Sequence, residues 1–111
     1  DIVLEATTGP YAGQTWILKP RQGKAPKKIG RSTGKHFTSQ GVSLPDDAEV
    51  STTHGKFEMK DGKVLFTDCE STNGSQLNGK PLEAREATPL NTGDILEVGG
   101  GNFHVTVTVV A

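Results

Sequence analysis

The sequence predicts an all-β domain, a two-sheet antiparallel β-sandwich of about ten to eleven short strands. Three observations indicate this fold. Short runs rich in β-branched residues, some alternating apolar with polar residues, recur roughly every eight to twelve residues. The 14 glycines and six prolines supply turns between these runs. No run has the apolar spacing of a helix, and many short strands bury their apolar faces best as two packed sheets.

The expected strands extend from Ile2 to Val110. In order, they lie at Ile2–Ala6, Thr15–Leu18, Lys27–Gly30, Val42–Leu44, His54–Met59, Val64–Asp68, Ser75–Leu77, Thr88–Leu90, Ile95–Val98 and Phe103–Val110. The last run is the clearest, because apolar and polar residues alternate strictly within it. Its residues expected to face the core are Phe103, Val105, Val107 and Val109.

Turn and loop signals separate these runs. Gly23–Pro26 and Thr33–Gln40 are expected to be the most mobile loops. Asp61-Gly62 predicts a tight hairpin, because both residues tolerate the positive φ that such turns need, and Asn78-Gly79 predicts a second one. Asn91–Asp94 turns the chain before the strand that begins at Ile95.

Length and composition predict a single domain over residues 1–111. The chain starts at Asp1 rather than Met, so we expect it to be cut from a larger protein. Its one cysteine, Cys69, excludes an internal disulfide and fits a reducing compartment, which predicts an intracellular location in the nucleus or cytoplasm. No apolar stretch has the length of a membrane span, and no signal peptide opens the chain.

The charges are distributed unevenly. The net charge of −1 argues against general attraction to nucleic acid, and no nucleic-acid or membrane contact is predicted. Between Ala6 and Pro45, however, there is no acidic residue, whereas seven of the 12 basic residues lie there. This asymmetry predicts an anion-binding side; the alternative is that the lysines only solvate loops. Arg31 and Lys35 are the close candidates, because both follow the strand that ends at Gly30.

Four short motifs lie at the ends of predicted strands: Gly30-Arg31-Ser32, Ser51-Thr52-Thr53-His54, Ser71-Thr72-Asn73-Gly74 and Asn78-Gly79. They bring an arginine, hydroxyls and a carboxamide onto adjacent loops. A guanidinium matches phosphate oxygens with a planar fork of donors, and a carboxamide can both donate to and accept from a peptide backbone. These groups suit a phosphate carried on a peptide. A small hydrolase using Ser51 and His54 is a weaker reading, because no acid is placed to orient the histidine.

On these motifs, residues 29–99 resemble the forkhead-associated (FHA) domain, a phosphothreonine-peptide binding module. Two further features carry the resemblance as markers of the fold: Gly9-Pro10 with Gly13, and Leu90-x-x-Gly93-Asp94-x-Leu96-x-Val98-Gly99. The resemblance implies that phosphate and peptide are bound by Arg31, Ser51, Thr52, Thr72 and Asn73. In this set Arg31, Ser51 and Thr72 would hold the phosphate, and Asn73 would hold the peptide main chain.

The resemblance also implies supporting roles. Peptide contacts are expected from Lys35, His36 and Asn78, and structural roles around the site from Gly30, His54 and Gly74. Two residues depart from the family pattern. Thr52 stands where the family usually carries Arg, Asn or Lys, and Gly55 replaces the usual Ala after the histidine. The first departure removes a longer polar side chain, for which Lys35 and His36 could compensate.

The sequence therefore predicts a non-enzymatic module that binds phosphothreonine-containing proteins in signalling or regulatory assembly, with no catalytic residue and no cofactor. The alternative is a phosphate-independent interaction domain with a vestigial pocket. No metal site is predicted, because Asp46, Asp47 and Glu49 lack the spacing of a calcium loop. Cys69 has no basic sequence neighbour to stabilise a thiolate, so no reactive role is expected for it.

Overall fold

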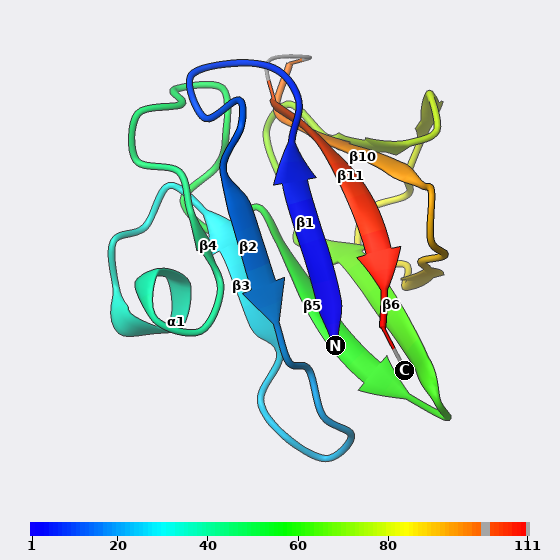
Figure 1. The fold of residues 1–111 in the computed structure, drawn as a ribbon. Coiled ribbons are helices and arrows are strands. Elements are labelled where there is room, and N and C mark those ends of the chain that lie inside the picture. The colour runs from blue at the N-terminus through cyan, green and yellow to red at the C-terminus, as the bar shows by residue number, and fades with distance from the viewer. Residues whose placement is uncertain (101–102, 111) are drawn as a thin grey trace.

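The computed structural model describes residues 1–100 and 103–110, which form two packed β-sheets and one short helix (Figure 1). The sheets have the orders β2-β1-β11-β10-β7-β8 and β4-β3-β5-β6-β9. This arrangement confirms the predicted all-β sandwich. The elements are β1 Ile2–Ala6, β2 Thr15–Leu18, β3 Lys27–Gly30, α1 Lys35–Thr38, β4 Val42–Ser43, β5 Gly55–Lys60, β6 Lys63–Asp68, β7 Ser75–Leu77, β8 Lys80–Pro81, β9 Thr88–Pro89, β10 Ile95–Val98 and β11 Phe103–Val109.

The core lies between the two sheets and is formed by the alternate apolar residues of their strands. Phe57 and Phe66 pack together from the five-stranded sheet, with ring centroids 5.1 Å apart. Phe103 packs against Trp16 within the six-stranded sheet, at 5.8 Å. In β11 the predicted inward residues are confirmed, with three fully buried and Val109 partly buried against the core.

Both predicted hairpin turns are confirmed by their backbone angles. Asp61 and Gly62 have φ of 52° and 77°, and Asn78 and Gly79 have φ of 52° and 83°. The second turn leads into β8, which pairs with β7 and was not predicted. Two residues, one of them proline, are too few to give a strand pattern.

Two features of the segment after β3 differ from the prediction. Residues 33–40, expected to be a mobile loop, contain the single-turn helix α1, whose Phe37 is buried. Four residues are too few to give helical periodicity. This segment also carries the chain back across the sheet edge, so that β4 pairs with β3 in parallel rather than antiparallel orientation.

The two ends of the described chain lie side by side at one end of the sandwich (Figure 1). The amino group of Asp1 donates to the carbonyl of Val110 at 3.0 Å, and the Val110 N–H donates to the Asp1 carbonyl at 2.8 Å. Arg21 adds an ion pair to the Asp1 carboxylate at 2.8 Å. β1 and β11 are therefore paired up to the ends of the described residues, Asp1 and Val110.

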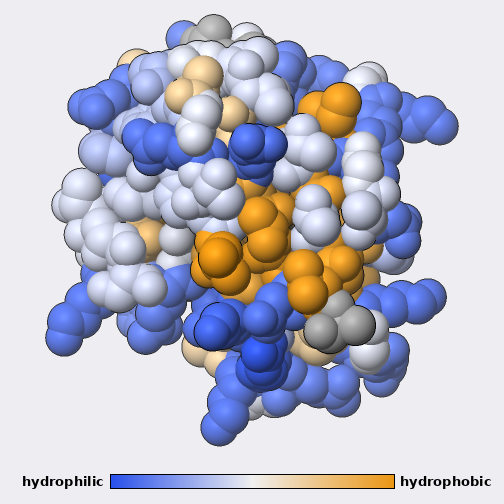
Figure 2. Space-filling view, in the orientation of Figure 1, coloured by the Kyte–Doolittle hydropathy of each residue, from blue (hydrophilic) through white to orange (hydrophobic). Residues whose placement is uncertain are grey.

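The surface near these ends is partly apolar. Figure 2 shows apolar side chains gathered over β1, β2 and β11. Ile17 on β2 is 63% exposed and Val110 is 45% exposed. In the part of the chain that the structure describes, no helix has the length and apolar character needed to cross a bilayer.

The opposite end of the sandwich collects three loops. β3 and β6 end there and β5 begins there, because Gly55 pairs with Ile29 on one side and with Asp68 on the other. The loops pack closely: a Cβ on Gly30 would lie 2.1 Å from the Thr52 carbonyl oxygen, so only glycine fits. The departure at position 55 has a similar reason, because a Cβ there would lie 2.5 Å from the Phe66 ring.

Candidate functional site

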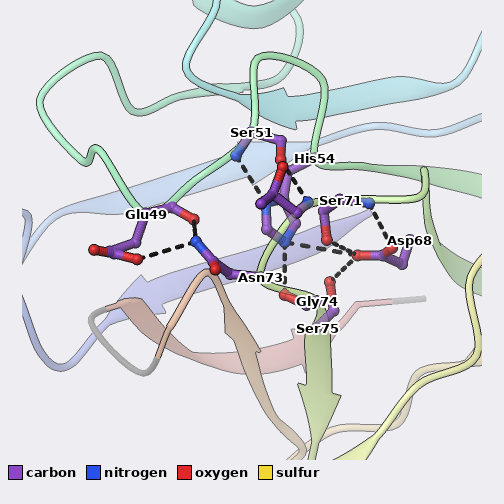
Figure 3. A network of polar contacts seen from close by, with 9 residues as sticks. Glu49, Ser51, His54, Asp68, Ser71, Asn73, Gly74 and Ser75 are labelled. Carbon is purple, nitrogen blue, oxygen red and sulfur yellow. Dashed lines mark hydrogen bonds and ion pairs between the residues drawn. The ribbon is translucent and has the colours of Figure 1, made fainter.

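Three segments form the candidate site, which we call the loop cluster: residues 31–34 after β3, residues 44–54 before β5, and residues 69–74 between β6 and β7. Figure 3 shows side chains of the last two segments pointing toward one another in a network of hydrogen bonds. All three segments begin or end at neighbouring strands, so the sheet fixes where they meet.

The imidazole of His54 connects these segments from inside. It is fully buried; its Nδ1 accepts from the Ser51 N–H at 3.1 Å and its Nε2 donates to the Gly74 carbonyl at 2.8 Å (Figure 3). Because Nδ1 accepts, the ring proton is on Nε2. Burial lowers the pKa of His54, outweighing the Gly74 hydrogen bond and the charge of Asp68. The ring is therefore neutral and holds two loops together.

The Ser51 side chain bridges to the next loop. Its Oγ accepts from the Thr72 N–H at 2.9 Å, which leaves the hydroxyl proton available to a ligand. His54 bonds the backbone N–H of Ser51 rather than its hydroxyl. The arrangement required of a nucleophile and its base is therefore absent from this pair, which argues against the hydrolase reading.

Arg31 is exposed, and one side-chain and one backbone hydrogen bond anchor it. Its Nε donates to the Val50 carbonyl at 2.7 Å, and its backbone N–H donates to the Ser51 carbonyl at 3.0 Å. Its two terminal nitrogens have no partner among the described residues. The guanidinium is thus oriented beside Ser51 with donors free for an anion.

Asp68, at the end of β6, shapes the third segment. Its buried carboxylate accepts from the Ser71 and Ser75 hydroxyls, both at 2.6 Å, and from the Ser71 N–H at 3.0 Å (Figure 3). These bonds turn the chain so that Thr72 and Asn73 are exposed at its tip. The Thr72 hydroxyl has no partner among the described residues.

The Asn73 carboxamide uses its nitrogen, but not its oxygen, in hydrogen bonds within the chain. Its Nδ2 donates to the Glu49 carbonyl at 2.8 Å and to the Glu49 carboxylate at 3.0 Å (Figure 3). Its Oδ1 has no partner among the described residues, so it is available to accept an N–H from a peptide. Glu49 thereby orients Asn73 and places a negative charge at this edge of the loop cluster.

The remaining predicted residues lie around or outside the loop cluster. Thr52 is exposed, and its carbonyl accepts from the Ser32 N–H at 3.2 Å. Lys35 and His36 are exposed on α1, which begins shortly after Arg31. Asn78 lies at the far end of β7, where its carboxamide donates to Asp94 at 3.0 Å and accepts from the Ile95 N–H at 2.9 Å. That carboxamide ties the turn between β7 and β8 to the start of β10.

Sequence reasoning missed two functional neighbours, Glu49 and Asp68. The role of Asp68 could have been predicted from the sequence, since an acidic residue at a strand end three residues before a serine is typical of a side chain that caps a turn. No sequence pattern indicates the role of Glu49, because its contact with Asn73 joins residues 24 positions apart on two different loops. In the described part of the chain, no three His, Cys, Asp or Glu side chains gather as metal ligands.

Sequence comparison identifies relatives of this chain. The family model of the FHA domain matches residues 27–99. The oxoglutarate dehydrogenase inhibitor of Corynebacterium glutamicum is 30% identical over 97 residues, which are 87% of this chain and 59% of that protein. The glycogen accumulation regulator GarA of Mycolicibacterium smegmatis is 29% identical over 97 residues, which are 87% of this chain and 53% of GarA. The chain thus spans less than two thirds of each.

Solved structures agree with the family match. The FHA domain of an Arabidopsis thaliana hypothetical protein superposes with a TM-score of 0.82 at 25% identity, over 99% of this chain and 86% of that one. A structure from work on phosphothreonine-dependent FHA domain interactions superposes with a TM-score of 0.74 at 25% identity, over 99% and 97% of the two chains. The chain belongs to the family of forkhead-associated domains.

Proposed function

We propose that this domain binds phosphothreonine-containing proteins or peptides and catalyses no reaction on them. Arg31 and the hydroxyls of Ser51 and Thr72 bind the phosphate, and Asn73 Oδ1 accepts a main-chain N–H of the peptide beside it. Thr52 borders the phosphate, and Lys35 and His36 contact the peptide farther out. Asn78 has only an indirect part, because its carboxamide is bonded to Asp94 and Ile95.

One observation carries this proposal: hydrogen-bond donors without partners among the described residues gather on loops that buried side chains hold in place. The terminal nitrogens of Arg31 and the Ser51 hydroxyl proton are free, while neutral His54 and buried Asp68 fix the loops that carry them. A phosphate monoester carries about −1.5 to −2 charges at neutral pH and three acceptor oxygens, which match such a set.

The relatives support a regulatory setting. One is an inhibitor of oxoglutarate dehydrogenase, another is a regulator of glycogen accumulation, and one solved relative comes from work on phosphothreonine-dependent interactions. We extend this to a role in signalling or regulatory assembly inside the cell, in the nucleus or cytoplasm. A larger parent protein containing this domain is part of the same proposal.

The test begins with an oriented phosphothreonine peptide library, which supplies the preferred peptide for calorimetry. The phosphorylated peptide is expected to bind, and its unphosphorylated form is not. Arg31→Ala is expected to weaken binding tenfold or more while the domain stays folded, because charge-assisted hydrogen bonds to phosphate are lost. Arg21→Ala is the matched control, since Arg21 pairs with Asp1 at the other end of the sandwich.

Equal affinity for the phosphorylated and unphosphorylated peptides would overturn the proposal. It would favour the alternative of a phosphate-independent interaction domain instead. Equal weakening by Arg31→Ala and Arg21→Ala would reduce the binding to a general effect of positive charge.

A further inference from the structure

A second polar group lies on the outer face of the five-stranded sheet and contains none of the residues proposed to bind phosphothreonine. It lines a pocket of about 240 Å³. The lining residues are Lys56 on β5, Thr67 on β6, Cys69 just after β6, and Arg85 from the segment between β8 and β9. Two of these side chains are cations, and a third is a hydroxyl.

Strand register concentrates positive charge at this pocket. Lys28 on β3 pairs with Lys56, which in turn pairs with Thr67, so the three side chains form one row across the sheet. Two lysines directly opposite each other repel. Neither lysine has an ion-pair partner among the described residues, so nothing there offsets this repulsion.

Thr67 is the second, independent observation. Its side chain is buried, with the residue only 5% exposed, yet Oγ1 has no hydrogen-bond partner among the described residues. A buried hydroxyl without a partner is unfavourable, so such groups require an explanation. This one lines a pocket with two cations, which points to an acceptor that binds there.

Arg85 lines the same pocket and is held by two hydrogen bonds. Its backbone N–H donates to the Asp68 carbonyl at 2.8 Å, and its side-chain Nε donates to the Glu70 carboxylate at 2.6 Å. The terminal nitrogens have no partner among the described residues. Burial raises the pKa of Cys69, while the charges of Lys56, Lys28 and Arg85 act in the opposite direction and Asp68 adds to the increase.

We propose that this pocket is a second anion site, which binds a phosphate group between Lys56, Arg85 and the Thr67 hydroxyl, with Lys28 at its rim. The site shares Cys69 with the last segment of the loop cluster, but it uses none of the residues proposed to bind phosphothreonine and does not rest on the proposed function. Its ligand is a small tetrahedral oxyanion, either free phosphate or a phosphate ester on a partner. The Thr67 hydroxyl donates to one oxygen, and the cations bind the others.

The test is a titration of the 111-residue chain with inorganic phosphate, followed by amide NMR at constant ionic strength. It uses the Arg31→Ala protein, so that the loop cluster contributes little. Saturable shifts are expected at Lys56, Thr67 and Cys69. Lys56→Gln is expected to weaken binding roughly tenfold, whereas Lys60→Gln, an exposed lysine on the same face of β5, is expected to leave it unchanged.

Thr67→Val separates binding from folding. Valine keeps the shape of the side chain and removes the hydroxyl, so phosphate affinity is expected to fall while the melting temperature of the free protein stays the same or rises. Shifts that do not saturate, or equal losses in Lys56→Gln and Lys60→Gln, would overturn the site. So would a Thr67→Val protein with unchanged phosphate affinity.

Cys69 supplies a second readout, because it is the one cysteine of the chain and lines the pocket. Bound phosphate is expected to slow its alkylation by iodoacetamide relative to sodium chloride at equal ionic strength, and in Lys56→Gln the same protection is expected to need a roughly tenfold higher phosphate concentration. An alkylation rate that phosphate does not change contradicts the proposal. Repeating the titration with N-acetyl phosphoserine amide distinguishes the sources: binding supports an esterified phosphate, and binding of inorganic phosphate alone supports the free ion.

Discussion

His54 and Asn73 lie in the same network but serve different partners. Both His54 ring nitrogens are used within the chain, whereas Asn73 keeps its Oδ1 for a ligand. Glu49 holds the other end of the Asn73 carboxamide, so its orientation is set before a peptide arrives. The motif residues could be found from the sequence, but the division of their hydrogen bonds could not, because it depends on contacts between loops.

Substitution by alanine separates these two roles. His54→Ala is expected to lower the free energy of unfolding by about 2–4 kcal/mol, because it leaves a cavity and two unpaired backbone groups. Asn73→Ala is expected to change stability by at most about 1 kcal/mol, since the side chain is exposed, yet to abolish peptide binding. Urea unfolding and calorimetry check both. A fully stable His54→Ala protein that cannot bind peptide would show that His54 contacts the ligand, and the two roles would then have to be exchanged.

Discrimination between phosphothreonine and phosphoserine is a second prediction at this scale. The two ligands carry the same phosphate and differ only in the γ-methyl group. Burying that methyl is worth about 0.8 kcal/mol, and a β-branched side chain gives up less rotamer freedom on binding. A preference for phosphothreonine of about tenfold is therefore expected by calorimetry on one peptide pair. Indistinguishable affinities would indicate a non-selective anion binder.

At the scale of elements, strands were predictable and the shortest elements were not. The strict alternation of apolar and polar residues predicts β11. The turns at Asp61-Gly62 and Asn78-Gly79 are predicted by residues that tolerate positive φ. The helix α1 and the strand β8 are formed by tertiary contacts, the burial of Phe37 and the pairing with β7, which leave no periodic pattern in sequence. The loop between β6 and β7 is likewise set by one buried carboxylate, Asp68.

The role of Asp68 in shaping the loop between β6 and β7 can be tested by Asp68→Asn, which keeps the shape of the side chain and removes its charge. The amide cannot accept all three hydrogen bonds from Ser71 and Ser75, so a loss of about 1–3 kcal/mol in stability and a weaker peptide affinity are expected. Asp61→Asn is the matched control, because Asp61 is exposed in a hairpin where asparagine also tolerates positive φ. Equal stability of the two variants in urea unfolding would show that Asp68 does not organise the loop.

At the scale of the whole molecule, the sandwich buries the imidazole of His54 completely. His54 has a folded-state pKa lowered from 6.5 by burial, so the unfolded chain takes up its proton at a higher pH than the folded chain. Its contribution to stability is therefore fully present above about pH 6.5 and is lost as the pH falls through the folded pKa. Glu70, whose pKa is lowered by Arg85, acts in the same direction in more acidic solution.

Urea unfolding of the wild type between about pH 5 and pH 8 is expected to show a free energy of unfolding that declines below about pH 6.5. His54→Gln lacks the titrating ring, so its stability is expected to be lower at neutral pH and flatter across this range. Parallel pH profiles for the two proteins would contradict a buried neutral histidine.

The pairing of the two chain ends has a mechanical consequence. β1 and β11 are antiparallel, and Asp1 and Val110 hydrogen-bond to each other at one end of that pair. Pulling these ends apart would open the ladder like a zipper, one rung at a time. A pull between Asp1 and the loop cluster would instead load the β1–β11 hydrogen bonds together in shear, because the loop cluster lies at the opposite end of the sandwich. The domain is therefore expected to resist that pull better than a pull between Asp1 and Val110.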